Sequence, residues 1–239
     1  MARKMSHLLR LALVALAVLI TFHQTTQAGP PLICHPFEIG DARSLPWDGP
    51  EWRSVKADYS IHRLVEDTLA LLTPDTPVLV RMETLRRVTV YAVWARIDRK
   101  VGYAVSDAKV ADELLARLRA RAEAVKGQGA AEALALFDYG YLVESYKQAG
   151  DKGRQAAGPD GYALLVRAIG LRGHDPAMEF AAALATAHAQ GGAHREHLRK
   201  AVAGAADGSL LARNLVRHFG QHGKGLTELR AQFGGAPAR

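Results

Sequence analysis

The feature that most constrains the fold is a helical spacing of apolar residues that recurs from residue 61 to residue 219. Glycine and proline divide this part of the chain into segments, and within most segments apolar residues return every three or four positions. That spacing places them on one face of an α-helix. The loops are short, so successive helices should be antiparallel neighbours. The sequence predicts an all-α fold of about eight helices in antiparallel pairs, either a bundle or a solenoid-like superhelix.

Capping residues and turns place most of these helices. Asp175-Pro176 is typical of an N-cap followed by a first-turn proline, and Thr76-Pro77 has the same form. The segment after Pro77 contains the strand-like sequence "VTVYAVW", but its length and its lack of turn residues favour one helix of about 20 residues. The other expected helices cover residues 61–72, 106–127, 130–150, 160–171, 176–189, 193–205 and 209–219.

One segment resembles part of a known repeat. The sequence "DYGYLVESYKQAG" (residues 138–150) has aromatic and small residues at helical spacing and a closing Ala-Gly. It resembles the second half of a tetratricopeptide-type unit, although the pattern is not repeated at the spacing of that repeat. The resemblance implies TPR-like pairing of helices and covers no other part of the chain.

The chain is expected to have four parts, beginning with a secretory signal peptide. A basic start, the apolar run 11–22 and the small residues of Thr26-Gln27-Ala28 follow one another in the order of such a peptide. The apolar run is shorter than the roughly 20 residues of a membrane span. We therefore expect export to the periplasm or beyond, with no stable span after cleavage; an uncleaved anchor is the alternative. The parts are the signal peptide 1–28, an extended arm 29–60, a helical domain 61–222 with a possible hinge at 151–159, and a flexible tail 223–239.

Composition narrows the classes of partner. The net charge is +7 for the whole chain, and 28 Lys and Arg against 24 Asp and Glu leave +4 after residues 1–28 are removed. There is no long basic block and no interleaving of basic with aromatic residues, so we expect no nucleic-acid partner. Nearly half of the residues are apolar, which predicts a substantial core. The single cysteine excludes a disulfide within the chain.

The proline-rich stretch before residue 61 is too apolar for a free linker. Five prolines remove backbone donors and favour extended geometry. We expect an arm that packs on the helices through Phe37, Trp47 and Trp52. The same arm holds the residues that a functional arm would use, which are Cys34, His35, Asp41 and Trp47.

Two constellations suggest chemistry. Cys34 is a free thiol beside His35, but neighbours in an extended chain point to opposite sides, so a base would come from elsewhere, for example His62. His188, His194 and His197 lie around one predicted turn and are candidate metal ligands. The alternatives are a small buried cysteine and solvated histidines near helix ends. The acids, among them Asp138 and Glu144 at residues 130–150, have no defined separation in the sequence.

The leading hypothesis is an exported helical module that binds a protein or a ligand, with another protein as the expected partner. The rival is a metal- or thiol-dependent site built from Cys34, His35 and the cluster of His188, His194 and His197. A third interpretation is a purely structural envelope component. Catalytic activity is left open with no catalytic signature in its favour, and the sequence names no cofactor.

Overall fold

The computed structural model describes residues 29–94, 97–98, 102–103, 108–150, 159–188, 192–220 and 225–234. Within these ranges the chain is all-α, as predicted, apart from one short antiparallel ladder. The predicted signal peptide and residues 151–158 of the predicted hinge lie outside the described residues. The elements are η1 (Ile61–Arg63), α2 (Leu64–Leu71), α3 (Val78–Thr89), η2 (Val90–Trp94), β1 (Ile97–Asp98), β2 (Gly102–Tyr103), α4 (Ala108–Ala124), α5 (Ala130–Gln148), α7 (Gly161–Arg172), α8 (Pro176–Ala185), α9 (Gly192–Gly204), α10 (Leu210–Phe219) and α11 (Leu226–Phe233).

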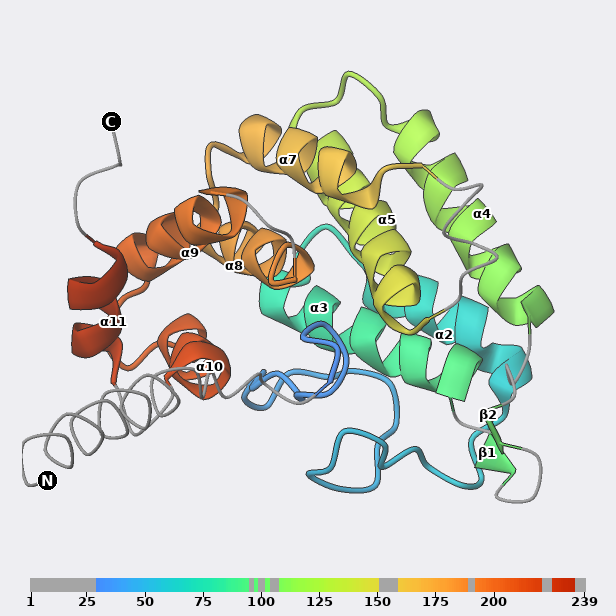
Figure 1. The fold of residues 1–239 in the computed structure, drawn as a ribbon. Helices are drawn as coiled ribbons and strands as arrows, with labels where there is room; N and C mark the ends of the chain where they lie inside the picture. The colour runs from blue at the N-terminus through green and yellow to red at the C-terminus, as the bar shows by residue number, and fades with distance from the viewer. Residues whose placement is uncertain are drawn as a thin grey trace, which may run out of the picture.

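Helix α5 is the centre of the packing (Figure 1). Every residue from Glu132 to Tyr146 is buried, and the helix contacts α3, α4, α7 and α8. The sequence predicted this helix, over 130–150, without indicating that it would be buried on every side. In a linear stack of repeats each unit contacts only its neighbours. Helices α3, α4, α7 and α8 pack around α5 as in a bundle, whereas α9 packs mainly on α8 and α11 on α9 and α10, as in a stack.

Helices α5 and α7 approach closely because glycines meet at their crossing. A Cβ atom added at Gly140 would lie 2.7 Å from the carbonyl oxygen of Gly161 and 2.9 Å from Cβ of Leu164. Such short contacts essentially never occur, so a larger residue at Gly140 would push the two helices apart. This contact fixes the antiparallel pair that lies above the centre of the molecule in Figure 1.

The single long helix predicted after Pro77 is wrong in its second half. Helix α3 ends at Thr89, the chain continues as the π-helical turn η2, and Ile97 then begins strand β1. The β-branched and aromatic residues of "VTVYAVW" have restricted side-chain rotamers in an α-helix, which favours departure from regular geometry at this point.

The two predicted caps differ in outcome. The carboxylate of Asp175 accepts hydrogen bonds from the backbone nitrogens of Ala177 (2.9 Å) and Met178 (3.3 Å), so this N-cap is confirmed. Thr76 does not cap α3. Its hydroxyl instead donates to the carbonyl oxygen of Leu71 at 2.6 Å, and Pro77 occupies the N-cap position.

The predicted flexible tail contains a helix. The sequence predicted a flexible tail over 223–239, and within it α11 spans Leu226–Phe233. Leu229 is fully buried, and the backbone nitrogen of Gly225 donates to the Glu228 carboxylate at 3.0 Å. The apolar spacing of the segment therefore anchors it on the neighbouring α9 and α10.

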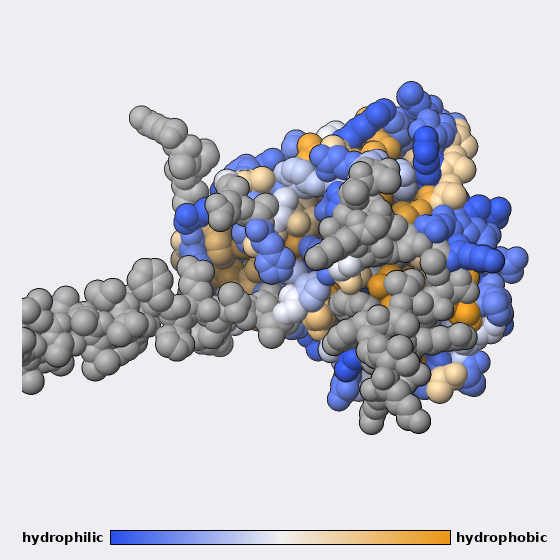
Figure 2. All heavy atoms as spheres, turned by 45° about the vertical axis from the view of Figure 1, so that its right-hand side comes forward, coloured by the Kyte–Doolittle hydropathy of each residue, from blue (hydrophilic) through white to orange (hydrophobic). Residues whose placement is uncertain are grey.

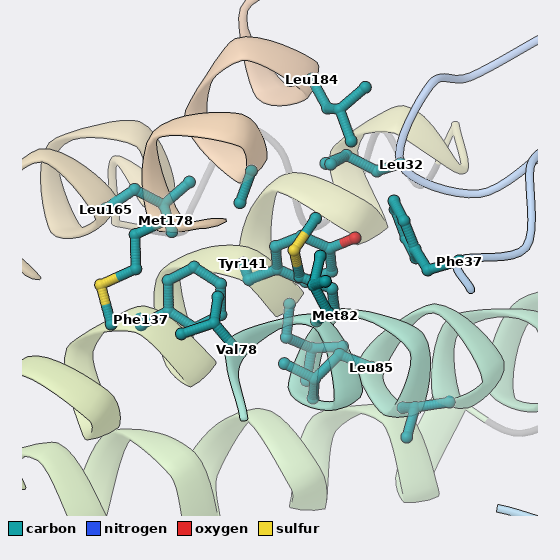
Figure 3. Packing of buried hydrophobic residues seen from close by; sticks show 14 of the residues in the cluster. Leu32, Phe37, Val78, Met82, Leu85, Phe137, Tyr141, Leu165, Met178 and Leu184 are labelled. Carbon is teal, nitrogen blue, oxygen red and sulfur yellow. The ribbon is translucent and has the colours of Figure 1, made fainter. Parts of the chain in front are cut away.

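Residues of the predicted arm enter the main core. Leu32, Ile33, Phe37 and Leu45 are buried, and Figure 3 shows Leu32 and Phe37 directed toward Tyr141 of α5. Hydrophilic side chains cover much of the face seen in Figure 2, with apolar patches between them. None of the described helices is both long and apolar enough to cross a bilayer.

Candidate functional site

Helix α3 carries two buried arginines, and each is paired with a buried carboxylate. Arg86 donates from Nε and Nη2 to Glu83 of the same helix, at 2.7 and 2.9 Å. Arg81 donates from Nη1 to Oδ2 of Asp138 on α5, at 2.6 Å. All four side chains are at most 2% exposed. Buried charges require partners. We therefore compare the hydrogen bonds of the two carboxylates, because an unpaired oxygen is available to a ligand and a fully paired one is not.

Glu83 is completely partnered. Besides Arg86, its carboxylate accepts from Nε of Arg87 at 2.7 Å and from the backbone nitrogen of Phe37 at 3.0 Å. Burial is the largest influence and raises the pKa of Glu83, but the hydrogen bonds and charges of these partners together outweigh it and leave the pKa lowered. The group is a permanently charged anchor for the arm.

The arginines of this cluster extend the anchor along the arm backbone. Nη1 of Arg86 donates to the carbonyl oxygens of Ile33 (3.2 Å) and Trp52 (3.0 Å), and Arg87 donates to the carbonyl of Leu45. The arm has only short turns and one β-bridge, Trp47 with Val55, among its own described backbone bonds, and these donors pair further carbonyl groups. Docking of residues 29–60 therefore depends on buried charge as well as on apolar contact.

Two side-chain amides hold the arm at its other contacts. Asn214 of α10 accepts from the backbone nitrogen of Glu38 at 2.9 Å and donates to the carbonyl oxygen of Glu38 at 2.8 Å. Gln148, the last residue of α5, accepts from the backbone nitrogen of Leu32 at 2.9 Å. We call the set Glu83, Arg86, Arg87, Gln148 and Asn214 the arm clamp.

Cys34 and His35 face different surroundings. Burial raises the pKa of the Cys34 thiol, and the nearby charges of Arg86 and Arg53 only partly oppose the rise. A thiol that stays protonated is a poor nucleophile. The ring of His35 instead lies against that of His218, with centroids 5.6 Å apart. The structure therefore does not favour Cys34 as the centre of a thiol-dependent site.

The other two residues of the predicted functional arm are accounted for by structure. Asp41 is exposed. Trp47 is half-buried under the guanidinium groups of Arg86 and Arg87, which lie 4.8 and 5.4 Å from its ring, and its indole nitrogen donates to the carbonyl of Glu51 at 3.1 Å. These cation–π contacts attach Trp47 to the arm clamp.

The three predicted metal ligands are not brought together. His188 is exposed, and Nδ1 of His194 lies 2.8 Å from the carbonyl oxygen of Ala183. His197 is engaged on both ring nitrogens, with Glu179 at 2.5 Å and the Tyr162 hydroxyl at 2.9 Å. Among the described residues, no three His, Cys, Asp or Glu side chains form a group that could hold a metal ion.

Glu179, His197 and Tyr162 form a buried hydrogen-bonded chain that resembles an acid–base relay in outline. Burial tends to raise the pKa of Glu179, but the hydrogen bonds from His197 and His174 outweigh it and the pKa is lowered. Burial and the negative charges of Glu179 and Asp160 raise the pKa of Tyr162. The phenol therefore keeps its proton, and the chain joins α7, α8 and α9 instead of activating a nucleophile.

Asp138 differs from these satisfied groups. Its Oδ1 atom is buried and has no hydrogen-bond partner in the described part of the chain. Burial raises the pKa of Asp138 to about 6, against the lowering effects of the Arg81 charge and hydrogen bond and of the Arg121 charge. A buried carboxylate with a perturbed pKa beside a pocket is a candidate functional group.

The pocket lies between the α2–α3 loop, α3, α4 and α5, and its volume is about 110 Å³. Its polar groups are Asp138, Arg81 and Arg121, and its remaining walls are apolar. Nε of Arg81 also donates to the carbonyl oxygen of Thr76 and Nη2 to that of Thr73, so each nitrogen of this guanidinium has an acceptor within the protein. The apolar walls are Leu72, Pro74, Val125, Ala131, Leu134 and Ala135.

Arg121 completes the polar part of this pocket. Its Nη1 donates to the carbonyl oxygen of Leu72 at 3.0 Å, which holds the side chain at the pocket. A guanidinium has five N–H donors, and this guanidinium makes no other hydrogen bond in the described ranges. We call Asp138, Arg121 and their apolar walls the Asp138 pocket.

A larger cleft of about 400 Å³ lies on the other side of the α4–α5 pair, against α7. It is lined by Tyr139 and by exposed charged side chains, including Arg119 and Lys126. Its acidic residue Glu132 is already paired with Arg167 and accepts from the backbone of Gly127. Because no unpartnered buried group opens into it, this cleft is the weaker candidate.

Sequence reasoning named Asp138 only as one acid among several and gave no role to Arg81 or Arg121. A usable signal was present, because Asp138 follows Leu134 by four residues and so shares an apolar helix face with it. A carboxylate at such a position needs a buried partner or a ligand.

Comparison with known proteins finds no matching family model, no matching curated protein and no matching solved structure. We therefore infer the function from the geometry of this chain.

Proposed function

We propose that this protein is a ligand-binding module whose Asp138 pocket recognises a primary carboxamide group. The observation that carries the proposal is the buried Oδ1 atom of Asp138, which has no hydrogen-bond partner among the described residues and belongs to a residue that lines this pocket. Leaving such an acceptor unpaired is unfavourable by about 1–3 kcal/mol. A ligand with an N–H group removes that penalty, which is a direct physical reason for binding.

The charges of the pocket select a carboxamide among small polar groups. Asp138 offers an acceptor and Arg121 offers donors, so a group with an N–H and a carbonyl oxygen satisfies both. Two guanidinium groups and one carboxylate leave a net positive charge, which disfavours an ammonium group. A carboxylate would be attracted by Arg121 but repelled by Asp138, and it has no donor for Oδ1.

The size of the pocket limits what enters. A cavity of about 110 Å³ is smaller than the roughly 150 Å³ apolar cavity that accommodates benzene. Only a small molecule, or the amide end of a larger one, fits inside. The apolar walls suit a short aliphatic chain next to the amide. The sequence predicts a protein partner, and this stays a prediction. Asparagine and glutamine side chains end in a carboxamide, so a protein can supply the group that we propose for this pocket.

Propionamide, propionate and propylammonium test the proposal because they differ mainly in the polar group. Each is titrated into isotope-labelled protein at pH 7.5, and binding is followed by NMR shifts of the pocket methyl groups, such as Leu134. We expect propionamide to bind with a Kd on the order of millimolar and the other two at least about 10-fold more weakly. Equal binding of all three would overturn the proposal.

Asp138→Asn is the decisive variant, since it keeps the shape of the side chain and removes its charge. We expect propionamide affinity to fall at least about 10-fold, or about 1.4 kcal/mol. Asp75→Asn is the matched control, because Asp75 is exposed and close in the chain to Pro74 of the pocket. Its affinity for propionamide should equal that of the wild type.

Export is a separate part of the proposed function. The order of charges and apolar residues in 1–28 supports cleavage after Ala28. N-terminal sequencing of the protein purified from its own cells tests this directly. A mature chain that begins at Gly29 is the expected result, and an intact Met1 would favour the uncleaved anchor.

A further inference from the structure

A further cleft lies between the arm and helix α2, in a part of the molecule that the amide proposal does not use. Its volume is about 430 Å³. Residues 43–46 of the arm form one wall, and the other wall is formed by Tyr59, Arg63, Asp67, Ala70 and Leu71. None of these residues lines the Asp138 pocket. We call this opening the arm cleft.

The arm wall of the cleft is held in place by contacts with the helical core. Oγ of Ser44 lies 3.0 Å from Oγ1 of Thr84 on α3, within hydrogen-bond distance. The carbonyl oxygen of Pro46 accepts from the hydroxyl of Tyr91 in η2 at 2.7 Å. Because these contacts already fix the segment, a ligand that pairs with it has less conformational entropy to remove on binding.

The backbone of this segment is open to a partner at Arg43 and Ser44. Neither residue belongs to a helix, a strand or a turn. Their backbone N–H and C=O groups make no hydrogen bond within the part of the chain that the structure describes. Arg43 is exposed and Ser44 is half-buried, so these groups depend on water. Exposed, unpaired backbone groups are a template on which another chain adds as a strand.

The charges of the arm cleft favour an acidic ligand. Asp67 already has a partner for each oxygen, because Oδ1 accepts from Arg63 at 3.1 Å and Oδ2 accepts from the Tyr59 hydroxyl at 2.9 Å. Arg43 makes no ion pair with any described residue. Two arginines against one carboxylate therefore leave a positive charge on the cleft. Only Nη2 of the Arg63 guanidinium donates to Asp67, so its other nitrogens keep N–H donors for a ligand.

The size and the apolar part of the cleft fit a few residues of a peptide. Its volume of about 430 Å³ lies within the roughly 300–1,000 Å³ of typical ligand sites. Pro46 on the arm and Ala70 and Leu71 on α2 supply apolar surface beside the arginines. An aliphatic side chain next to an acidic one would therefore contact both parts of the cleft.

We propose that the arm cleft binds a short acidic segment of another protein in an extended conformation. The backbone of the segment pairs with that of Arg43 and Ser44, and one of its carboxylates lies between the guanidinium groups of Arg43 and Arg63. A small anion satisfies the charges but leaves the backbone groups unpaired. The proposal is independent of the amide pocket.

The peptide acetyl-Leu-Glu-Leu-Glu-Leu N-methylamide tests the proposal, because it has acidic and aliphatic side chains in alternation and no primary carboxamide. It is titrated into the isotope-labelled protein, and binding is followed by NMR at the amide of Ser44 and the methyl groups of Ala70 and Leu71. We expect a Kd on the order of 0.1 mM. The same peptide with threonine or lysine in place of glutamate should bind at least about 5-fold more weakly. Equal binding of the three peptides would overturn the proposal.

Hydrogen exchange tests the backbone pairing separately from the charge. The amides of Arg43 and Ser44 should exchange quickly in the free protein and at least about 10-fold more slowly at saturation with the glutamate peptide. If both amides exchange at the same rate with and without the peptide, it does not add as a strand and the proposal is wrong.

Arg43→Gln is the matching variant of the protein. Since Arg43 is exposed and unpaired among the described residues, the variant should fold like the wild type. We expect its affinity for the glutamate peptide to fall about 5-fold, as for the loss of one exposed ion pair. Arg117→Gln is the control, because Arg117 is an exposed arginine on α4 that lines none of the three clefts. Unchanged affinity in Arg43→Gln, or an equal loss in Arg117→Gln, would contradict the site.

Discussion

The two arginine–carboxylate pairs of α3 are equally buried but differently completed. Glu83 accepts hydrogen bonds from two arginines and a backbone nitrogen, and its pKa is lowered. Within the described ranges the carboxylate of Asp138 accepts only from Arg81, and burial raises its pKa to about 6. The difference shows how structural and functional charge can be separated within one core. A fully partnered charge stabilises the fold, whereas a partly partnered one beside a pocket is available to a ligand.

Removal of the arm should lower stability more than any other change, because it removes the backbone groups that bind Glu83, Arg86 and Arg87. Deleting residues 29–55 exposes the contacts of Leu32, Ile33, Phe37 and Leu45. At about 1.5–3 kcal/mol for each side chain, the loss is comparable with the whole stability of a domain. We expect no cooperative thermal transition for residues 56–239. Circular dichroism measures the melting temperature of both chains. If residues 56–239 melt at the same temperature as residues 29–239, the arm is not a structural clamp.

Substitution Glu83→Gln should destabilise the protein by about 3–5 kcal/mol, because it leaves Arg86 buried with no opposite charge. Urea denaturation at pH 7 measures the change. The control is Glu38→Gln, which breaks an ion pair with Arg213 whose side chains are 40 and 49% exposed. Exposed pairs contribute up to about 1 kcal/mol. If both variants lose a similar free energy of unfolding, the buried ion pair of the arm clamp contributes no more to stability than the exposed pair.

Asp138→Asn should change how stability depends on pH. The pKa is about 6 in the folded chain and 3.8 for the free group, so the folded state binds this proton more tightly. The contribution of Asp138 to stability is fully present below the unfolded pKa and is lost as pH rises through about 6. Two pH units at about 1.4 kcal/mol each amount to about 3 kcal/mol.

Urea denaturation of both proteins at several values between pH 4 and pH 7.5 tests this linkage. Relative to the wild type, the Asp138→Asn variant should gain about 2.4 kcal/mol across that range, because part of the titration lies below pH 4. Parallel pH profiles for the two proteins would mean that Asp138 titrates normally and is not a group held for a ligand.

Asn214→Ala should have the smallest effect of these changes. It removes two hydrogen bonds to the backbone of Glu38 at the edge of the arm clamp. At about 1 kcal/mol for each bond, we expect a loss of about 2 kcal/mol in chemical denaturation. Gln128→Ala removes an exposed amide and should change stability by less than about 0.5 kcal/mol. A loss no larger than that of the control would show that Asn214 adds little to arm docking.

The helices were predictable because their signals are local. The Asp175-Pro176 cap and the glycines between segments act within a few residues, and the structure has helices close to the expected ranges. The error after Thr89 was also local in origin, since strand-like residues competed with the helical pattern. The helical tail at Leu229 was underestimated because its stability comes from burial against other helices.

The candidate sites were much less predictable, because they are made by contacts between distant residues. Asp138 meets Arg81 across 57 residues, and Phe37 meets Glu83 across 46. The spacing of residues along the chain does not predict such distant contacts. The sequence grouped His35 with His188, His194 and His197, whereas its ring lies against that of His218. Of the three histidines around one predicted turn, His194 and His197 have separate partners and His188 is exposed.

The most direct test of the central claim is the pKa of Asp138 with and without ligand. The ¹³Cγ shift of Asp138 is followed by NMR from pH 3 to pH 8, first alone and then with saturating propionamide. The account predicts a pKa near 6 in the free protein. It predicts a clear decrease with propionamide, since a hydrogen bond to the carboxylate favours its charged form. A pKa near 4 in the free protein, or one that propionamide leaves unchanged, would contradict it.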